Sequence, residues 1–277
     1  MKKTKIISLL ALAMLLNFSK SFSQQKISIW SLTEDLEKSQ VKEFQAIPNF
    51  FSVHLTGKLL IWEGSDLKIS VWKLDDNMNP VKKNTYAIPK DWSIVNCADE
   101  KILFRKLDGK LSLWGFNEKG DREWLTEFPA QKGWDIVNYS SNSFLWKNDA
   151  GKVFFWELDD RGKVLSKKEV IAPAGYTPIN YGSYGILWMK NRANFYQFWR
   201  LDDKGKVIAK NNIGTIPKWN ALSCNESVIF WVHDSGKLSL WYMDPLSANK
   251  TSVKEFPAIN GWSSLGYHDW HLLWLKN

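Results

Sequence analysis

The sequence predicts an all-β protein, a six-bladed β-propeller with four antiparallel strands in each blade. Two observations support this: a repeat of nearly constant length, and turn signals that divide each repeat into four. A tryptophan ends an apolar run once per repeat, at spacings of 42, 42, 42, 43 and 42 residues. These residues are Trp30, Trp72, Trp114, Trp156, Trp199 and Trp241. A fixed period of this length is typical of repeat architectures.

Two other aromatic positions recur with the same period. One ends a Leu-Leu-Trp type run, at Trp62, Phe104, Trp146, Trp188, Trp231 and Trp274. The other opens a short strand, at Phe50, Trp92, Trp134, Tyr176, Trp219 and Trp262. In one repeat the intervals between anchors are 12, 10 and 20 residues. Because a strand with its turn takes roughly 10 residues, the longest interval contains a fourth strand, seen at 122–128 and 163–171.

The turns agree with this division. Asp-Gly and Asp-x-Gly sequences at 108–109, 149–151 and 234–236 join the second and third strands, and glycine supplies the positive φ of a tight hairpin. Consecutive apolar residues, as in 144–146, indicate sheets buried on both faces. Six such sheets fit the blades of a propeller. The alternative is a pair of tandem β-trefoils with three repeats each.

The first 23 residues have the pattern of a secretory signal peptide. Three early lysines precede an apolar stretch at 6–18, and the small residues of 21–23 predict cleavage before Gln24. No later stretch reaches the roughly 18 apolar residues of a membrane helix. We therefore expect a secreted or periplasmic protein that is not embedded in a membrane.

The predicted propeller is one domain, residues 24–277, whose ends share its last blade. Residues 27–30 and 41–46 resemble a third and a fourth strand, and residues 262–267 and 271–275 a first and a second. Together they make one blade. We thus expect the N-terminal strands within 26–46 and the C-terminal strands within 262–275 to close the ring, and we expect a monomer.

Charge and cysteine content narrow the function classes. The chain carries 37 basic and 29 acidic residues, and the leader holds four of the lysines, so the mature chain is only mildly basic. No basic block with interleaved aromatics indicates a nucleic-acid partner. Cys97 and Cys224 are too few for a disulfide scaffold and occupy equivalent positions in different repeats, so we expect two buried free thiols.

Motifs for catalysis are missing from the sequence. It contains no Gly-x-Ser-x-Gly, no Gly-rich phosphate loop and no Cys-x-x-Cys. The His268-Asp269-Trp270-His271 segment resembles a metal site only weakly, and the paired acids such as Asp159-Asp160 lack the spacing of a calcium loop. We expect a protein that is not an enzyme and that uses no metal or other cofactor.

Repeats with tryptophan at strand ends and Asp/Gly turns resemble propeller lectins of the tachylectin and fungal fucose-lectin kind, over residues 26–277. The resemblance is one of architecture, and it implies several similar sugar sites. Flat aromatic surface beside turn carboxylates suits a sugar. The candidate ligand-binding residues are therefore the strand-opening aromatics with two turn acids: Phe50, Trp92, Trp134, Tyr176, Trp219, Trp262, Asp108 and Asp234.

A second candidate set lies four residues after each opening aromatic. These positions are mostly polar and are expected to line the central channel, either holding a ligand or satisfying backbone groups at the crowded axis. They are His54, Asn96, Asn138 and Asn180, followed by Ser223 and Gly266. The expected function is a binding protein for glycans with several weak sites. The first alternative is an interaction scaffold for an envelope protein. The second, against the expectation of no catalysis, is a metal-dependent enzyme that uses the His268 to His271 region.

Overall fold

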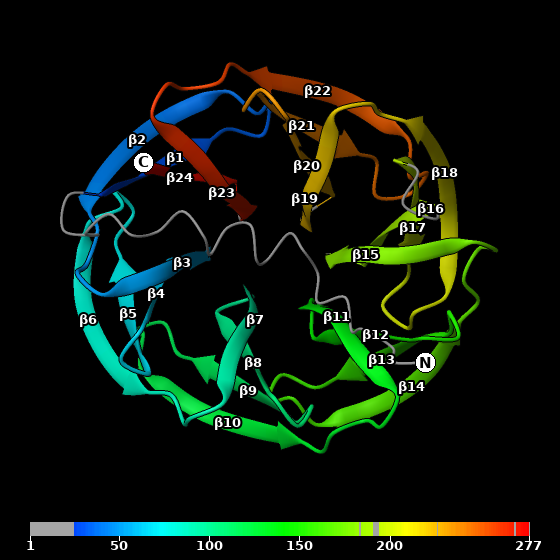
Figure 1. The fold of residues 1–277 in the computed structure, drawn as a ribbon, viewed down its shortest axis with the longest axis horizontal. Helices are drawn as coiled ribbons and strands as arrows, with labels where there is room; N and C mark the ends of the chain where they lie inside the picture. Colours follow the sequence, from blue (N-terminus) through cyan, green and yellow to red (C-terminus); the bar gives the residue numbers. More distant parts are fainter. Residues whose placement is uncertain (1–24, 183, 191–193, 226, 269, 277) are drawn as a thin grey trace, which may run out of the picture.

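The computed structural model describes residues 25–182, 184–190, 194–225, 227–268 and 270–276. They form six four-stranded sheets around a central axis (Figure 1). The strands of residues 50–87, which are β3 to β6, form blade 1, and each following set of four strands along the chain forms the next blade. Blade 6 consists of β23, β24, β1 and β2. The predicted leader, residues 1–23, lies outside the described residues. The strands are β1 Lys26–Leu32, β2 Lys38–Gln45, β3 Phe50–Thr56, β4 Leu59–Gly64, β5 Lys68–Leu74, β6 Pro80–Ala87, β7 Trp92–Ala98, β8 Lys101–Lys106, β9 Leu111–Phe116, β10 Arg122–Phe128, β11 Trp134–Ser140, β12 Ser143–Asn148, β13 Val153–Leu158, β14 Val164–Val170, β15 Tyr176–Gly182, β16 Gly185–Lys190, β17 Phe195–Leu201, β18 Val207–Thr215, β19 Trp219–Asn225, β20 Val228–His233, β21 Leu238–Met243, β22 Lys250–Phe256, β23 Trp262–His268 and β24 His271–Lys276.

Within a blade, strands that follow one another in the chain pair side by side. In blade 3, β11 pairs with β12, β12 with β13 and β13 with β14, all antiparallel. The first strand of each blade lies innermost and the fourth lies at the outer rim (Figure 1). The prediction of a six-bladed propeller is confirmed, and the tandem-trefoil alternative is wrong because the strands form six separate sheets.

In blades 2, 3 and 5 the turn between the second and third strands uses glycine where the backbone has a positive φ. Gly109 has a φ of 90° and Gly236 a φ of 84°, in hairpins that an aspartate opens. In the first of these turns the Asp108 carboxylate also accepts a hydrogen bond from the backbone N–H of Lys110, at 3.0 Å. Such conformations strain any residue with a Cβ, so the Asp-Gly pairs fix the hairpins.

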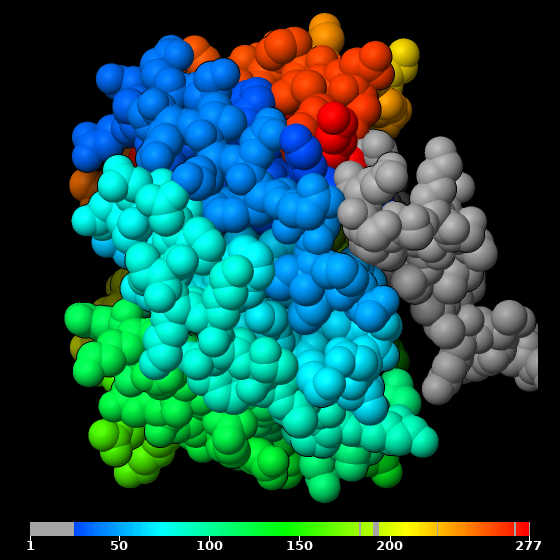
Figure 2. Space-filling model, turned by 90° about the vertical axis from the view of Figure 1, so that its left-hand side faces the viewer, coloured from blue at the N-terminus to red at the C-terminus, as the bar shows by residue number. Residues whose placement is uncertain are grey.

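Blade 6 joins the two ends of the chain. β1 pairs with β24 in antiparallel register, with Ile27 opposite Leu275 and Ser31 opposite His271. The strand order across this sheet is β2-β1-β24-β23. In the space-filling view the blue residues that begin the described part of the chain lie against the red residues that end it (Figure 2). The ring is therefore held closed by main-chain hydrogen bonds between its first and last strands.

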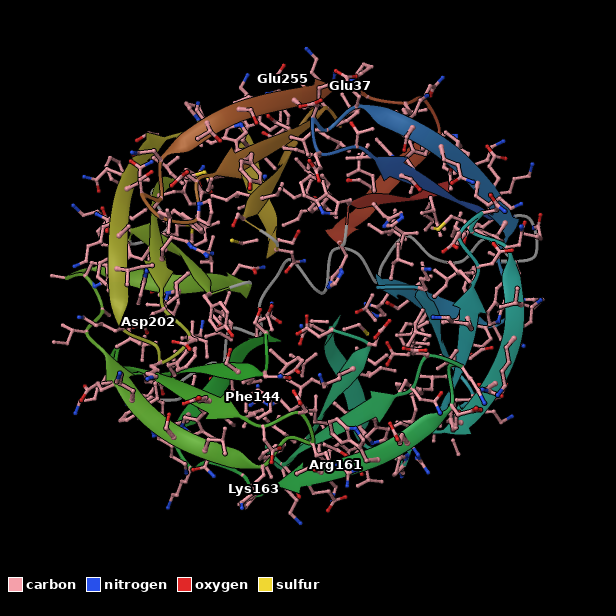
Figure 3. The ribbon with its side chains drawn as sticks, turned by 180° about the vertical axis from the view of Figure 1, so that it is seen from behind. Glu37, Phe144, Arg161, Lys163, Asp202 and Glu255 are labelled. Carbon is pink, nitrogen blue, oxygen red and sulfur yellow. The ribbon has the colours of Figure 1, made fainter. Side chains whose placement is uncertain are left out.

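The core lies between neighbouring blades. The middle strands are buried on both faces, as in β4, whereas outer strands such as β6 alternate between partly buried and exposed residues. Phe144 on β12 packs edge-on against Phe128 of blade 2, with ring centroids 4.9 Å apart. Figure 3 places Phe144 inside the ring of sheets, while Arg161 and Lys163 lie toward the rim. Blade-to-blade packing of this kind buries the apolar area that holds the ring together.

A stack of aromatic rings crosses each blade. The second-strand aromatic packs against the third-strand tryptophan, as Trp146 does against Trp156 at 5.0 Å between centroids. A cation from the fourth strand then lies over that tryptophan, at 3.6 to 4.6 Å from its ring centroid. Such contacts are attractive because the ring face is electron-rich. The pairs are Lys38 over Trp30, Lys83 over Trp72, Arg122 over Trp114, Lys167 over Trp156, Lys210 over Trp199 and Lys250 over Trp241.

The two cysteines are buried and free, which confirms that part of the sequence analysis. Burial raises the pKa of the Cys224 thiol to about 12 and raises the pKa of Cys97 well above its usual value. Both thiols therefore stay protonated and poorly nucleophilic. Over the described residues, no helix is long and apolar enough to cross a bilayer.

Candidate functional site: blade grooves and the central channel

A groove opens on blade 2, beside the connection from blade 1. It has a volume of about 170 Å³ and is lined by the rings of Trp92, Phe104 and Trp114 and by the charged side chains of Arg122 and Glu127. Trp92 is the aromatic that opens the innermost strand, and the other two rings belong to the stack across the blade. The groove thus combines an aromatic surface with one cation and one carboxylate.

The same groove recurs on blade 3. Its volume is about 230 Å³, and it is lined by Trp134, Trp146, Phe154, Trp156 and Lys167. The three tryptophans stand 42 residues after the three rings of the blade 2 groove. Two successive blades therefore present equivalent grooves at equivalent positions, which is the arrangement that repeated weak sites require.

The two grooves differ in one hydrogen-bond donor. In blade 2 the indole N–H of Trp114 donates to Ser112 Oγ at 2.9 Å. The equivalent of that serine in blade 3 is Phe154, which instead packs edge-on against Trp134 with centroids 4.8 Å apart. Among the described residues the indole N–H of Trp156 has no acceptor. The blade 3 groove therefore offers a ligand a donor that the blade 2 groove uses internally.

The other opening aromatics are half-buried like Trp92 and Trp134. Each packs against a side chain of its own blade. Phe50 contacts Trp62 at 6.2 Å between centroids, Tyr176 contacts Phe195 at 6.3 Å, Trp219 contacts His233 at 5.0 Å, and Lys276 lies 6.0 Å from the Trp262 ring. The opening aromatics thus combine a packing role with a partly accessible face.

The two predicted turn acids lie near these aromatics but line neither groove. The backbone N–H of Asp234 donates to the carbonyl of Lys218, just before Trp219, at 2.9 Å. Asp108 is held differently: the backbone N–H of Lys110 and the nearby lysines keep the pKa of its carboxyl below the usual value. Asp108 also pairs with Lys106 at 3.3 Å. Both acids stay candidates for a ligand that extends beyond the grooves.

Sequence reasoning missed the charged groups of the grooves. Arg122, Glu127 and Lys167 all come from fourth strands. Glutamate recurs at the place of Glu127 in four blades, whereas Arg122 and Lys167 stand at different places in their strands. The available signal was cross-strand pairing: Lys167 stands directly opposite Trp156, and Glu127 opposite Ser112. A search for charged residues opposite the repeated tryptophans would have found Lys167 but not Glu127.

The predicted channel residues lie around the axis and line a cavity of about 350 Å³. The asparagines connect neighbouring blades there. Asn96 Nδ2 donates to the carbonyl of Tyr139 at 2.7 Å, and Asn138 Nδ2 donates to that of Tyr181 at 2.8 Å. These amides therefore satisfy backbone groups of the next innermost strand, the second of the two roles that the sequence allowed.

His54 lies in the channel wall, where it is kept neutral. Burial, together with the nearby His268, lowers the pKa of its imidazole to about 4. Its Nε2 is 2.9 Å from Ser52 Oγ. Because a buried imidazolium would lose its hydration, the folded protein binds a proton here less readily than the unfolded chain does.

The lowered pKa of His54 predicts that the protein becomes less stable in acid. The contribution of His54 is constant above pH 6.5 and declines as the pH falls toward 4, because only the unfolded chain gains the proton in that window. We expect about 2 kcal/mol lower stability at pH 5 than at pH 7 from this residue, relative to His54→Gln. Urea unfolding of both proteins at the two pH values measures the difference. Equal pH slopes for the two proteins would contradict this assignment.

The described residues of the histidine segment at 268–271 do not form a metal site. His268 and His271 line the channel, and Asp269 lies outside the described residues. Among the residues described, no group of three or more His, Cys, Asp or Glu side chains is placed to hold a metal ion.

The fold and its grooves define a β-propeller with repeated aromatic recesses. No protein-family model matches the chain, and no curated protein matches it. Solved structures do. The human WBSCR16 structure is 10% identical, with a TM-score of 0.53 over 84% of this chain and 79% of that one. At these identities the likeness shows the fold alone.

Two structures of the yeast propeller RCC1 (Prp20) are also similar. Prp20p of Saccharomyces cerevisiae, in a study of its binding to Gsp1p and histones, is 12% identical, with a TM-score of 0.53 over 87% of this chain and 77% of that one. The protein bound to Kap60 is 14% identical, with a TM-score of 0.52 over 80% of this chain. The match spans 65% of that chain's length.

Proposed function

We propose that this propeller is a non-catalytic carbohydrate-binding protein and that its sites are the grooves on its blades. The observation that carries the proposal is the equivalence of the blade 2 and blade 3 grooves. Each places aromatic faces beside a fourth-strand cation. A sugar stacks its C–H face on such rings and directs its hydroxyls to the polar groups.

The grooves also fit the weak, repeated binding that the resemblance to propeller lectins implies. A recess of 170 to 230 Å³ accommodates little more than one sugar ring, so each site alone binds weakly. Two equivalent grooves on neighbouring blades engage two branches or two units of one glycan. Avidity then compensates for the weak single sites.

Binding to a glycan array that spans host and bacterial sugars tests the proposal. We expect Trp134→Ala to reduce binding of the best ligand at least tenfold, because the blade 3 groove loses a ring. The matched control is Trp124→Ala, which removes a half-buried tryptophan of blade 2 that lines neither groove. An array without any binding, or an equal loss in the two variants, would refute groove-based recognition.

Export belongs to the same proposal. The leader predicted at residues 1–23 directs the protein to the periplasm or the exterior, where glycans are available. Mass spectrometry of the protein after secretion tests this prediction. We expect a mass that corresponds to a chain beginning at Gln24.

The second candidate function is an interaction scaffold for an envelope protein. One observation favours it: each outer strand exposes one aliphatic side chain, between 44% and 62% accessible. Six such residues spaced around the rim suit a protein partner that encircles or docks on the ring. They are Val41, Val81, Leu125, Leu165, Ile208 and Val253. Recovery of one stoichiometric protein partner, with no glycan bound on the array, would favour this function.

A further inference from the structure

The central cavity differs from the grooves in its chemistry. It measures about 350 Å³, which falls within the range of small-molecule sites. Its wall contains asparagine, serine, histidine, tyrosine and aliphatic side chains, and no Asp, Glu, Lys or Arg is among the described residues that line it. An ion entering this space would lose hydration without gaining an opposite charge, so the cavity favours an uncharged occupant.

The ring of side chains around the cavity is uneven. On one side Asn96 uses both ends of its amide, donating from Nδ2 to the Tyr139 carbonyl and accepting from the Tyr139 N–H at 3.3 Å through Oδ1. The pattern then breaks. Ser223 and Gly266 occupy the equivalent positions of blades 5 and 6, and the bridge to the Tyr267 carbonyl comes from Asn225 instead, at 3.1 Å.

Two polar atoms are left over where the pattern breaks. Asn180 Nδ2 donates to the Leu222 carbonyl at 3.2 Å, but its Oδ1 is buried and has no hydrogen-bond partner among the described residues. Ser223 Oγ is also buried and has no hydrogen-bond partner among the described residues. A buried polar atom without a partner destabilises the fold because it has lost its hydration without compensation, so both atoms favour a molecule that brings hydrogen-bonding groups to them. Both residues line the cavity.

Space for such a molecule lies next to these atoms. Gly266 also lines the cavity, and a Cβ built on it would meet no atom within 4 Å. Its backbone does not have the positive φ that would otherwise explain a glycine. The missing side chain therefore leaves a recess in the wall on the side where the unpaired atoms lie.

We propose that the central channel binds one small uncharged polyhydroxy molecule, such as a single sugar ring or a polyol, against Asn180, Ser223 and Gly266. A hydroxyl of the ligand donates to Asn180 Oδ1 and a second one exchanges a hydrogen bond with Ser223 Oγ. The aliphatic part of the wall, including Leu222 and Leu265, covers its C–H groups. The site is separate from the blade grooves and does not depend on carbohydrate binding there.

Calorimetry and ligand-observed NMR with D-glucose and glycerol as neutral probes, and glucuronate and glucosamine as charged counterparts, test this site. We expect a neutral probe to bind with a dissociation constant of millimolar or below, and the charged probes at least tenfold more weakly. Gly266→Val adds volume to the recess at a place where a Cβ meets no atom within 4 Å, and we expect it to weaken binding at least tenfold. Trp134→Ala, in the blade 3 groove, should leave channel binding unchanged.

The outcomes separate this site from its alternatives. No binding by any neutral probe would mean that the cavity holds ordered water only, and would overturn the proposal. Equal binding of glucuronate, or full binding by Gly266→Val, would overturn it as well. If the valine variant fails to fold, Ser223→Ala decides, because it removes one hydrogen bond without adding volume. Loss of probe binding in Trp134→Ala alone would assign the signal to the grooves.

Discussion

Replacing Gly182 by alanine is expected to lower the free energy of unfolding by about 3 kcal/mol. Gly182 ends the innermost strand of blade 4, next to the innermost strand of blade 5. A Cβ at this position would overlap the carbonyl oxygen of Cys224, a backbone atom that cannot rotate away as a side chain does. Both strands are fixed by their sheets at the crowded axis, so the strain spreads into two blades. Urea unfolding followed by tryptophan fluorescence measures the loss.

Gly266→Ala is the matched control for that change. It adds the same methyl group to another innermost strand, but at a place where no atom lies within 4 Å of the new carbon. We expect a change of no more than about 0.5 kcal/mol. If the two alanine variants lose the same stability, close approach of the blades is not what selects glycine at position 182.

Removing residues 25–46 is expected to abolish cooperative folding. This deletion takes away β1 and β2, and with them the buried side chains of Ile27 and Ile29, which are 0% and 1% exposed. β24 then loses its partner strand, and blade 6 keeps only a two-stranded hairpin, which is marginal in water. The faces of blades 5 and 1 that pack on this blade become exposed. Thermal melting followed by near-ultraviolet circular dichroism is expected to show no sharp transition.

A circular permutant tests whether this loss comes from the missing strands or from the position of the chain ends. Residues 25–46 are moved behind residue 276 through a short Asn-Gly turn, and the chain then begins at residue 47. Lys26 and Lys276 extend the paired register of β1 and β24, so a tight turn is long enough to join them. We expect the permutant to melt within a few degrees of the parent chain. A permutant as unstable as the deletion would show that the natural ends have another role.

The parts of the fold that the sequence predicted are those that repeat. Trp156 and its five equivalents recur because every blade needs a large ring at the same point between sheets. The number of copies of this tryptophan therefore equals the number of blades. The Asp-Gly turn at 108–109 could be predicted because few residues other than glycine adopt the φ of 90° found at Gly109. Both signals depend on local requirements that are the same in each copy.

The aromatic rings of the grooves repeat in register, but their cations were harder to predict because they do not. In three blades the cation over the tryptophan stands directly opposite it, as Lys167 does. In blade 2 the residue opposite Trp114 is Leu125, and the cation comes from Arg122 instead. Likewise the unpaired oxygen of Asn180 depends on which neighbour faces it across the axis. Such differences arise from packing between blades, which no period in the sequence records.

The pairing of β1 with β24 also sets the order in which the molecule is completed. Blades 1 to 5 each pair strands that are neighbours in the chain, so they form from local hairpins while synthesis continues. Ile27 meets Leu275 only after all the strands between them have been made. Among the described strands, β1 therefore waits the longest for a partner, and until then its apolar residues need protection from other chains. Completion of the ring is a single event that depends on the synthesis of β24.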